Sequence, residues 1–216
     1  MSQIAATVLS IGFFLWWPSP KPGHLRLVLR TYDAFGVTAG EMHQARITVD
    51  DLLRPASVHA EWRACPAARL SHRADEPGCG ELAGDELVVR IVAATPAIAS
   101  SSLGSALFDA GAGVLATVYA DRVVSLADRA RVDPGRLLGR VIAHELGHLL
   151  LSGPTHGAGG LMRPRWSVSE MRDERPLDWR WSSREIVDIA RAVESRTVPV
   201  TTTVSTCRPG AKCPRR

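Results

Sequence analysis

Three histidines, one glutamate and one methionine lie within nineteen residues, in the stretch HELGHLLLSGPTHGAGGLM from His144 to Met162. The whole chain of 216 residues has only seven histidines and four methionines. On a helix, His144 and His148 project from the same face one turn apart, so both imidazoles can reach a single metal ion. Glu145 lies roughly 100° round the helix from His144, offset from the ligands but within reach of a water on the metal. The pattern predicts a Zn²⁺ site with Glu145 as general base and then acid.

A third ligand has to come from beyond this helix, because a catalytic zinc has three protein ligands and one open position. Gly153-Pro154 ends the helix, and the chain that follows can fold back so that His156 reaches the metal. Zinc also accepts oxygen, and the carboxylates that could take this place instead are Glu170, Asp173, Glu174 and Asp178. The other histidines, at positions 24, 43, 59 and 72, are expected to be ordinary surface residues.

The alternative to a metal site is an amphipathic helix whose histidines are merely hydrogen-bonded polar groups. Apolar residues surround the motif, from Val141 and Ile142 to the run 149–151. Two histidines and a glutamate are costly to bury in such surroundings, because an unpaired polar group loses its hydration there. The sequence therefore favours the metal site.

HELGH, followed by a glycine, a third histidine and GLM, resembles the metzincin clan of zinc metallopeptidases. The clan's pattern is HExxHxxGxxH followed by a tight turn that carries a methionine. The resemblance implies the following roles: zinc ligands for His144, His148 and His156, base for Glu145, and a hydrophobic floor beneath the metal for Met162. A group of poorly characterised bacterial proteins is also similar to this stretch.

This chain departs from the clan's pattern in two places. The third histidine comes eight residues after His148 instead of six, and the glycine, Gly153, comes five residues after it instead of three. The bacterial group has this longer spacing. The clan also often has a tyrosine shortly after its methionine, where this chain has Arg163, Pro164 and Arg165. That role is unfilled or taken by another group, and Arg163, beside a proline, is expected to be solvated.

Strands and helices are predicted around the motif. Alternating or continuous apolar residues predict strands over 24–33, 57–65, 86–94 and 114–124. Helices are predicted after two capping boxes, Thr38 with Glu41 and Ser182 with Glu185, and between Asp133-Pro134 and Gly153-Pro154. Glycines 139 and 147 each cost this last helix about 1 kcal/mol relative to alanine, and close packing is the expected reason. With the resemblance, this order predicts an α+β, zincin-like metallopeptidase domain: a small mixed sheet with an active-site helix and a C-terminal helix.

The chain divides into three predicted regions: an apolar N-terminal signal or anchor (1–23), the catalytic domain (24–195) and a flexible tail (196–216). The apolar run 4–17 is broken by Pro18 and is too short for an ordinary membrane span. It fits the apolar region of a secretory signal, although a positively charged start and an Ala-x-Ala cleavage site are missing. An uncleaved membrane anchor and a buried N-terminal element are the alternatives.

Four cysteines form two local pairs, Cys65 with Cys79 and Cys207 with Cys213, and no C-x-x-C is present. Disulfides are therefore favoured over a zinc knuckle, with local pairing preferred among the three possible pairings. Together with the N-terminal segment, they predict a secreted or periplasmic protein. No propeptide with a cysteine switch is visible, because Cys65 and Cys79 lie between predicted strands.

The function predicted from these features is a zinc-dependent metalloendopeptidase that acts on peptide or protein substrates. The net charge is only +4, and no basic run with interleaved aromatic residues suggests nucleic-acid binding. The predicted strand 114–124 is a candidate edge strand for pairing with an extended substrate, the alternative being an ordinary interior strand. Two other functions remain open: a zinc hydrolase of a non-protein amide or ester, and a secreted binding module with structural zinc. The sequence predicts no oligomeric state.

Overall fold

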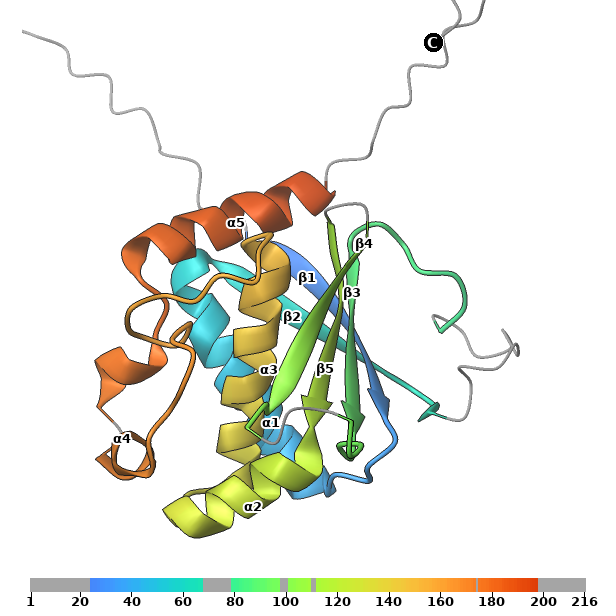
Figure 1. Ribbon diagram of the computed structural model, residues 1–216. Helices are drawn as coiled ribbons and strands as arrows, with labels where there is room; N and C mark the ends of the chain where they lie inside the picture. The colour runs from blue at the N-terminus through green and yellow to red at the C-terminus, as the bar shows by residue number, and fades with distance from the viewer. Residues whose placement is uncertain (1–23, 68–78, 98–100, 110–111, 174, 198–216) are drawn as a thin grey trace, which may run out of the picture.

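The computed structural model describes residues 24–67, 79–97, 101–109, 112–173 and 175–197 (Figure 1). The predicted signal or anchor 1–23 and the predicted Cys207–Cys213 pair lie outside the described residues, as does nearly all of the predicted tail. Within the described ranges, every helix is too short or too polar to span a membrane.

A five-stranded mixed sheet runs through the domain. Its strands are β1 (Leu25–Asp33), β2 (Val58–Cys65), β3 (Glu86–Val92), β4 (Gly104–Asp109) and β5 (Ala112–Tyr119), in the order β2-β1-β3-β5-β4. Neighbouring strands pair in parallel, except that β4 pairs antiparallel with β5. Parallel neighbours need a crossover connection, and the first helix supplies it between β1 and β2. In this strand order, the antiparallel strand β4 forms one edge of the sheet.

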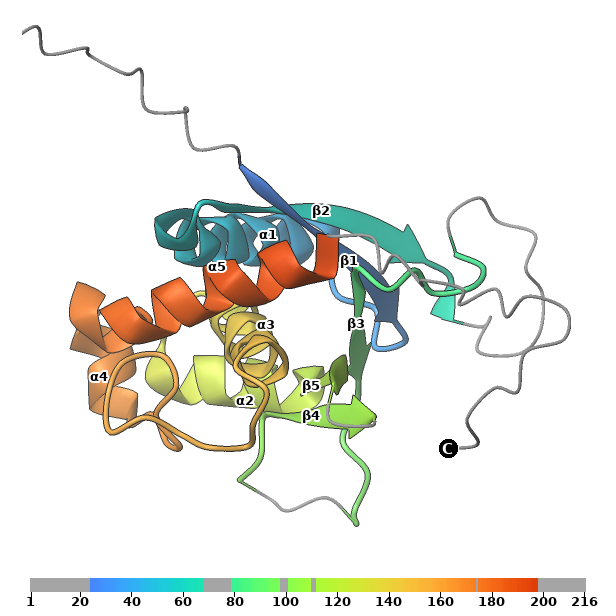
Figure 2. The same ribbon diagram turned by 90° about the horizontal axis from the view of Figure 1, so that it is seen from above.

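The helices lie on one side of this curved sheet, as Figure 2 shows. They are α1 (Ala39–Leu53), α2 (Ala120–Ala130), α3 (Pro134–Leu150), α4 (Val168–Asp173) and α5 (Ser183–Thr197), with short 3-10 helices η1 (Arg54–Ala56) and η3 (Pro176–Trp179). The histidine motif lies on α3, which packs between α1 and the strands β4 and β5. The predicted α+β class is thus confirmed, with its small mixed sheet, its motif-bearing helix and its C-terminal helix.

Local capping interactions set the helix starts as predicted. The Thr38 hydroxyl accepts a hydrogen bond from the Glu41 amide, and the Glu41 carboxylate accepts one from the Thr38 amide. Asp133 caps α3, whose first residue is a proline. Each cap satisfies backbone N–H groups that have no partner inside the helix. These caps need only neighbouring residues, which is why the sequence predicted them.

The strand predicted over 114–124 is wrong in its second half. β5 ends at Tyr119, and residues 120–124 begin α2. The buried residues of α2, Ala120, Val123, Ala127 and Ala130, are three or four apart, which is helical spacing. Of the two alternatives for this strand, the interior position is confirmed, because β5 lies between β3 and β4 and β4 forms the edge.

Cys65, the last residue of β2, forms a disulfide with Cys79, so this local pairing is confirmed. The bond fastens the end of β2 to the chain that leads into β3. Disulfides persist in oxidising compartments, so the bond indicates a location outside the cytoplasm.

The glycines of α3 allow other parts of the chain to approach its backbone closely. A Cβ at Gly139 would lie 2.6 Å from the carbonyl oxygen of Ala45 in α1, and one at Gly135 would lie 2.6 Å from that of Glu41. A Cβ at Gly147 would collide with the Met162 sulfur. The expectation that Gly139 and Gly147 serve close packing is confirmed.

Replacing Gly139 with alanine is therefore expected to lower the free energy of unfolding, because forcing α1 and α3 apart costs about 1–3 kcal/mol. The helix propensity gained, about 1 kcal/mol, offsets only part of this cost, since the added Cβ would meet backbone atoms of α1. Gly40→Ala in α1 is the matched control, since a Cβ there meets nothing within 4 Å. Urea unfolding followed by circular dichroism measures both variants. A Gly139→Ala protein as stable as the wild type would contradict the packing argument.

Candidate metal centre

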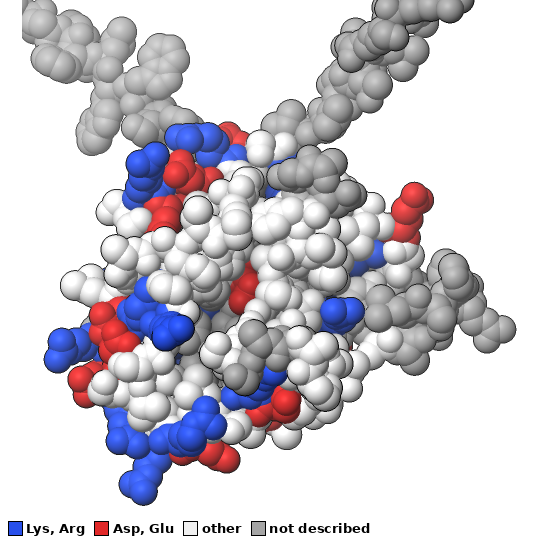
Figure 3. Space-filling model, viewed as in Figure 1, with Lys and Arg blue, Asp and Glu red and all other residues white. Residues whose placement is uncertain are grey.

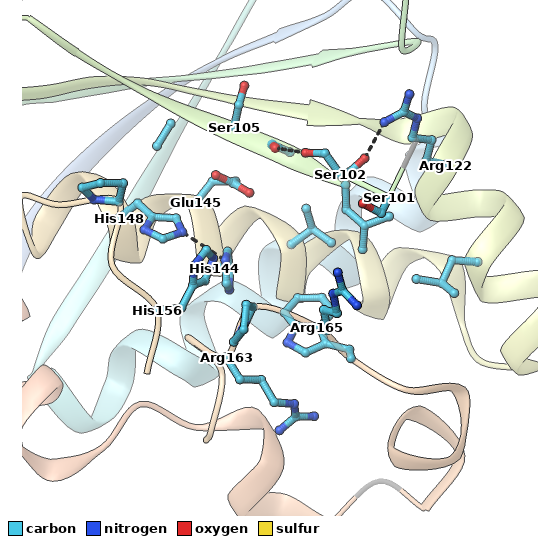
Figure 4. A pocket seen from close by; sticks show the side chains of 18 of the residues that line it. Ser101, Ser102, Ser105, Arg122, His144, Glu145, His148, His156, Arg163 and Arg165 are labelled. Atoms are coloured by element: carbon cyan, nitrogen blue, oxygen red, sulfur yellow. Dashed lines mark hydrogen bonds between the residues drawn. The ribbon is translucent and has the colours of Figure 1, made fainter. Parts of the chain in front are cut away.

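His144, His148 and His156 lie together at one end of a cleft (Figure 4). His144 and His148 come from α3, and His156 comes from the loop after it. One ring nitrogen from each residue lies within 4.8 Å of the others. The first two side chains are buried and the third is exposed. The structure therefore brings together the three residues predicted as ligands.

The alternative ligands and the other histidines lie elsewhere. Glu170, Asp173 and Asp178 do not belong to the histidine cluster, and Glu174 lies outside the described residues. Glu170 instead accepts hydrogen bonds from the amide and hydroxyl of Ser167. The surface positions predicted for His24, His43 and His59 are confirmed, whereas His72 lies outside the described residues.

Backbone carbonyls orient the two helical imidazoles. His144 donates its Nδ1–H to the Leu161 carbonyl at 2.8 Å, and His148 donates its Nδ1–H to the Gly153 carbonyl at 3.0 Å. Burial lowers the pKa of His144 to about 4 and also lowers the pKa of His148, so both rings are neutral near pH 7. A neutral ring that donates through Nδ1 carries a lone pair on Nε2.

The two Nε2 atoms face each other at 3.1 Å. Two lone pairs at this distance repel each other unless a cation lies close to both. The His156 ring completes the group, with its centroid 5.3 Å from that of His144 and 4.8 Å from that of His148. The donor set and its fixed tautomers therefore fit a metal ion, since carbonyl hydrogen bonds of this kind commonly orient metal-binding histidines.

The loop from 151 to 162 is held in place by backbone hydrogen bonds. The Gly157 amide donates to the Met162 carbonyl, and the Leu161 amide donates to the Arg180 carbonyl, each at 2.9 Å. Gly160 has a φ of +67°, and a Cβ there would collide with the Arg180 carbonyl, so only glycine fits this turn. The turn presents the Leu161 carbonyl to His144.

Met162 is fully buried and its sulfur lies against Gly147, which directly precedes His148 in the chain. A side chain at position 147 would displace the thioether. The methionine thus packs against the helix that carries two of the histidines, where it forms part of the hydrophobic core.

Arg163 is buried, and the expectation that it is solvated is wrong. Its Nη1 donates to the carbonyls of Gly160 and Asp178, and its guanidinium lies 5.2 Å from the centre of the Trp179 ring. Figure 4 shows the side chain pointing away from the histidines. Arg163 therefore supports the turn after the histidines rather than facing a reacting group. Asp178 and Trp179 lie 15 or more residues further along the chain, so the neighbours of Arg163 in sequence give no signal of this role.

Glu145 faces the cleft from α3, opposite β4 (Figure 4). It is buried, and desolvation raises its pKa to about 8. A Cβ at Gly104, the first residue of β4, would lie 2.6 Å from the Glu145 Oε1. The absence of a side chain at position 104 leaves room for the carboxyl group between the helix and the strand. Sequence reasoning missed Gly104, because only the fold shows what faces a glycine.

The cleft has a volume of about 960 Å³. One wall consists of β4 and the residues before it, and the opposite wall contains 163–166. Figure 3 shows the corresponding face of the molecule, which is hollowed between these walls. The histidines and Glu145 are thus accessible from an open groove with a strand along one side.

No protein-family model matches the chain, and no curated protein matches it. Among solved structures, the chain is similar to archaemetzincin from Methanopyrus kandleri, with 17% sequence identity and a TM-score of 0.47. The match covers 80% of this chain and 98% of that chain. A likeness of this degree does not place the chain in a family.

Proposed function

We propose that the protein is a zinc-dependent metalloendopeptidase of the metzincin type that works outside the cytoplasm. One observation carries this proposal: two buried imidazoles aim their Nε2 atoms at each other across 3.1 Å, beside a third imidazole and a buried carboxyl group. Such a group of side chains is costly to assemble without a cation, and its composition suits hydrolysis.

His144, His148 and His156 would hold the zinc, because three neutral imidazoles are typical of a catalytic zinc site. Three protein ligands leave one position open for water or substrate. Zinc supplies a Lewis acid that polarises a carbonyl group and acidifies water. The carbonyls of Leu161 and Gly153 keep the helical imidazoles in the tautomer that a metal requires.

Glu145 would take a proton from the attacking water and return it to the leaving amine. Burial alone raises its pKa and favours the protonated form. A nearby divalent cation acts in the opposite direction and favours the carboxylate, so the group becomes a base when the site is loaded. Its place against Gly104 keeps it beside the groove rather than among the histidines.

A peptide substrate is supported by the strand along the groove. Among the described strands, β4 has a neighbour on one side only, and Gly104, Ser105 and Ala106 line the cleft. The N–H and C=O groups on its outer side can pair with an extended peptide, which would add a strand to the sheet. The bond to be cut would then lie in the groove, between this strand and the histidines and next to Glu145.

The proposal predicts metal-dependent cleavage of peptides. The zinc-loaded protein is expected to cut members of a diverse peptide library, to lose this activity with a zinc chelator, and to regain it when zinc is restored. Mass spectrometry of the products measures each step. Cleavage of small acyl esters or amides with peptides ignored would point to a non-protein hydrolase. Tight zinc binding without any hydrolysis would point to a binding module.

A further inference from the structure

The cleft extends from the histidines along α3 toward α2. Its walls there are the α2 side chains and the segment 164–166, and Val141 lies between them on α3. This end of the cleft is next to Glu145, since Val141 precedes it by about one helical turn. A side chain of a bound substrate close to the reacting bond can therefore reach it.

Two arginines face this end of the cleft from α2. Arg122 and Arg129 are seven residues apart, which is about two helical turns, so they lie on the same side of the helix. Arg122 donates to the Ser102 carbonyl at 2.8 Å, and its guanidinium lies 5.4 Å from the centre of the Tyr119 ring. Arg129 donates to the Ser125 hydroxyl at 2.6 Å. A neutral hydroxyl thus positions Arg129, and a neutral carbonyl is one of the partners of Arg122.

Arg165 belongs to the opposite wall. Its side chain is exposed and directed into the cavity, as Figure 4 shows. It makes no hydrogen bond or ion pair with any residue that the structure describes, and Arg129 makes no ion pair with one. Some exposed arginines elsewhere, Arg26 and Arg191 among them, do contact carboxylates. Arg129 and Arg165 therefore line the cleft without a carboxylate partner in the described part of the chain.

The acidic residues of the cleft do not neutralise this end. The cleft is lined by four arginines, Arg122, Arg129, Arg163 and Arg165, and by two acidic residues, Asp121 and Glu145. The Asp121 carboxylate accepts a hydrogen bond from the Ala94 amide. Glu145 lies at the proposed reaction site. The balance of charge at the α2 end is positive.

We propose that Arg129 and Arg165, assisted by Arg122, select peptides with an acidic side chain beside the bond that is cut. This inference rests on the proposed peptidase function. Arginine forms charge-assisted hydrogen bonds with carboxylates, and these are stronger than bonds between neutral groups. Because the site is open to solvent, salt screens the attraction and weakens the preference.

The experiment is a cleavage profile of the zinc-loaded protein on a peptide library. We expect Asp or Glu to be enriched within two residues of the cleaved bond, with kcat/KM about tenfold higher than for the matched Lys peptide. The double variant Arg129→Glu/Arg165→Glu is expected to prefer Lys or Arg there. The control is Arg184→Glu/Arg191→Glu on α5, which changes the net charge equally outside the cleft. Circular dichroism checks that each variant is folded.

A binding measurement separates this inference from the proposed function. Fluorescent acidic, neutral and basic peptides are titrated into the zinc-loaded Glu145→Gln protein, and anisotropy reports their affinity. Tighter binding of the acidic peptide, lost in the variant that also carries both arginine reversals, supports the inference even if no peptide is cut. Peptide cleavage without an acidic preference, or equal affinity for all three peptides, overturns the inference. Failure to cut any peptide overturns the proposed function instead.

Discussion

Replacing Glu145 with glutamine is expected to lower the rate of peptide hydrolysis by about 10²–10⁴-fold while the protein keeps its zinc. The amide has nearly the same size as the carboxyl group, so it fits beside Gly104, but it cannot accept a proton from water. Glu145 does not belong to the cluster of three histidines that would bind the metal, so its replacement leaves the proposed ligands intact. Steady-state kinetics and zinc content measured on the same preparation test both halves of the prediction.

The matched control for this variant is Glu61→Gln. Glu61 is a partly exposed residue of β2, at the opposite edge of the sheet from β4. Its replacement removes the same functional group without touching the cleft and is expected to leave the rate unchanged. If Glu145→Gln retained more than about a tenth of the wild-type rate, proton transfer by Glu145 would contribute less than general base catalysis usually does.

Replacing His148 with alanine is expected to weaken zinc binding by more than about 100-fold. Loss of an orienting partner alone commonly costs 10–100-fold in metal affinity, and loss of a ligand costs more. The residual pair, His144 and His156, offers only two nitrogens. Competition with a chromophoric chelator measures the affinity. His59→Ala is the control, since His59 is exposed on β2 and lies outside the cluster.

His156→Ala tests the third ligand in the same assay. The exposed imidazole lies on the loop, so its removal leaves α3 and its carbonyl contacts in place. Its loss is expected to weaken zinc binding to a similar degree. A His156→Ala protein with wild-type affinity would contradict this assignment and would move the third ligand to another residue.

The sequence predicted those parts of the fold that short-range interactions determine. The capping boxes at Thr38 and Ser182 and the Asp133-Pro134 start require only neighbouring residues, and these starts agree with the structure. The spacing of His144 and His148 was informative for the same reason, because a helix places residues four apart on one face.

The parts that were not predicted depend on contacts between distant segments. The chain passes from β5 into α2 at Tyr119, within an apolar run whose strand and helix portions look alike in sequence. Arg163 is buried because it contacts Asp178 and Trp179, which lie 15 or more residues further along the chain. The carbonyls that orient His144 and His148 have no sequence signature, since every residue has one. The room that Gly104 leaves for Glu145 likewise appears only when β4 and α3 are packed together.

The central claim is that three histidines bind one zinc ion and leave a position open. X-ray absorption spectroscopy at the zinc edge of the zinc-loaded protein tests this claim most directly. The predicted result is one zinc per chain with three imidazole nitrogens and one further light ligand from solvent, all at about 2.0–2.2 Å. Failure to retain zinc, a sulfur ligand, or a fourth imidazole would contradict the account, because the site would then be absent or closed.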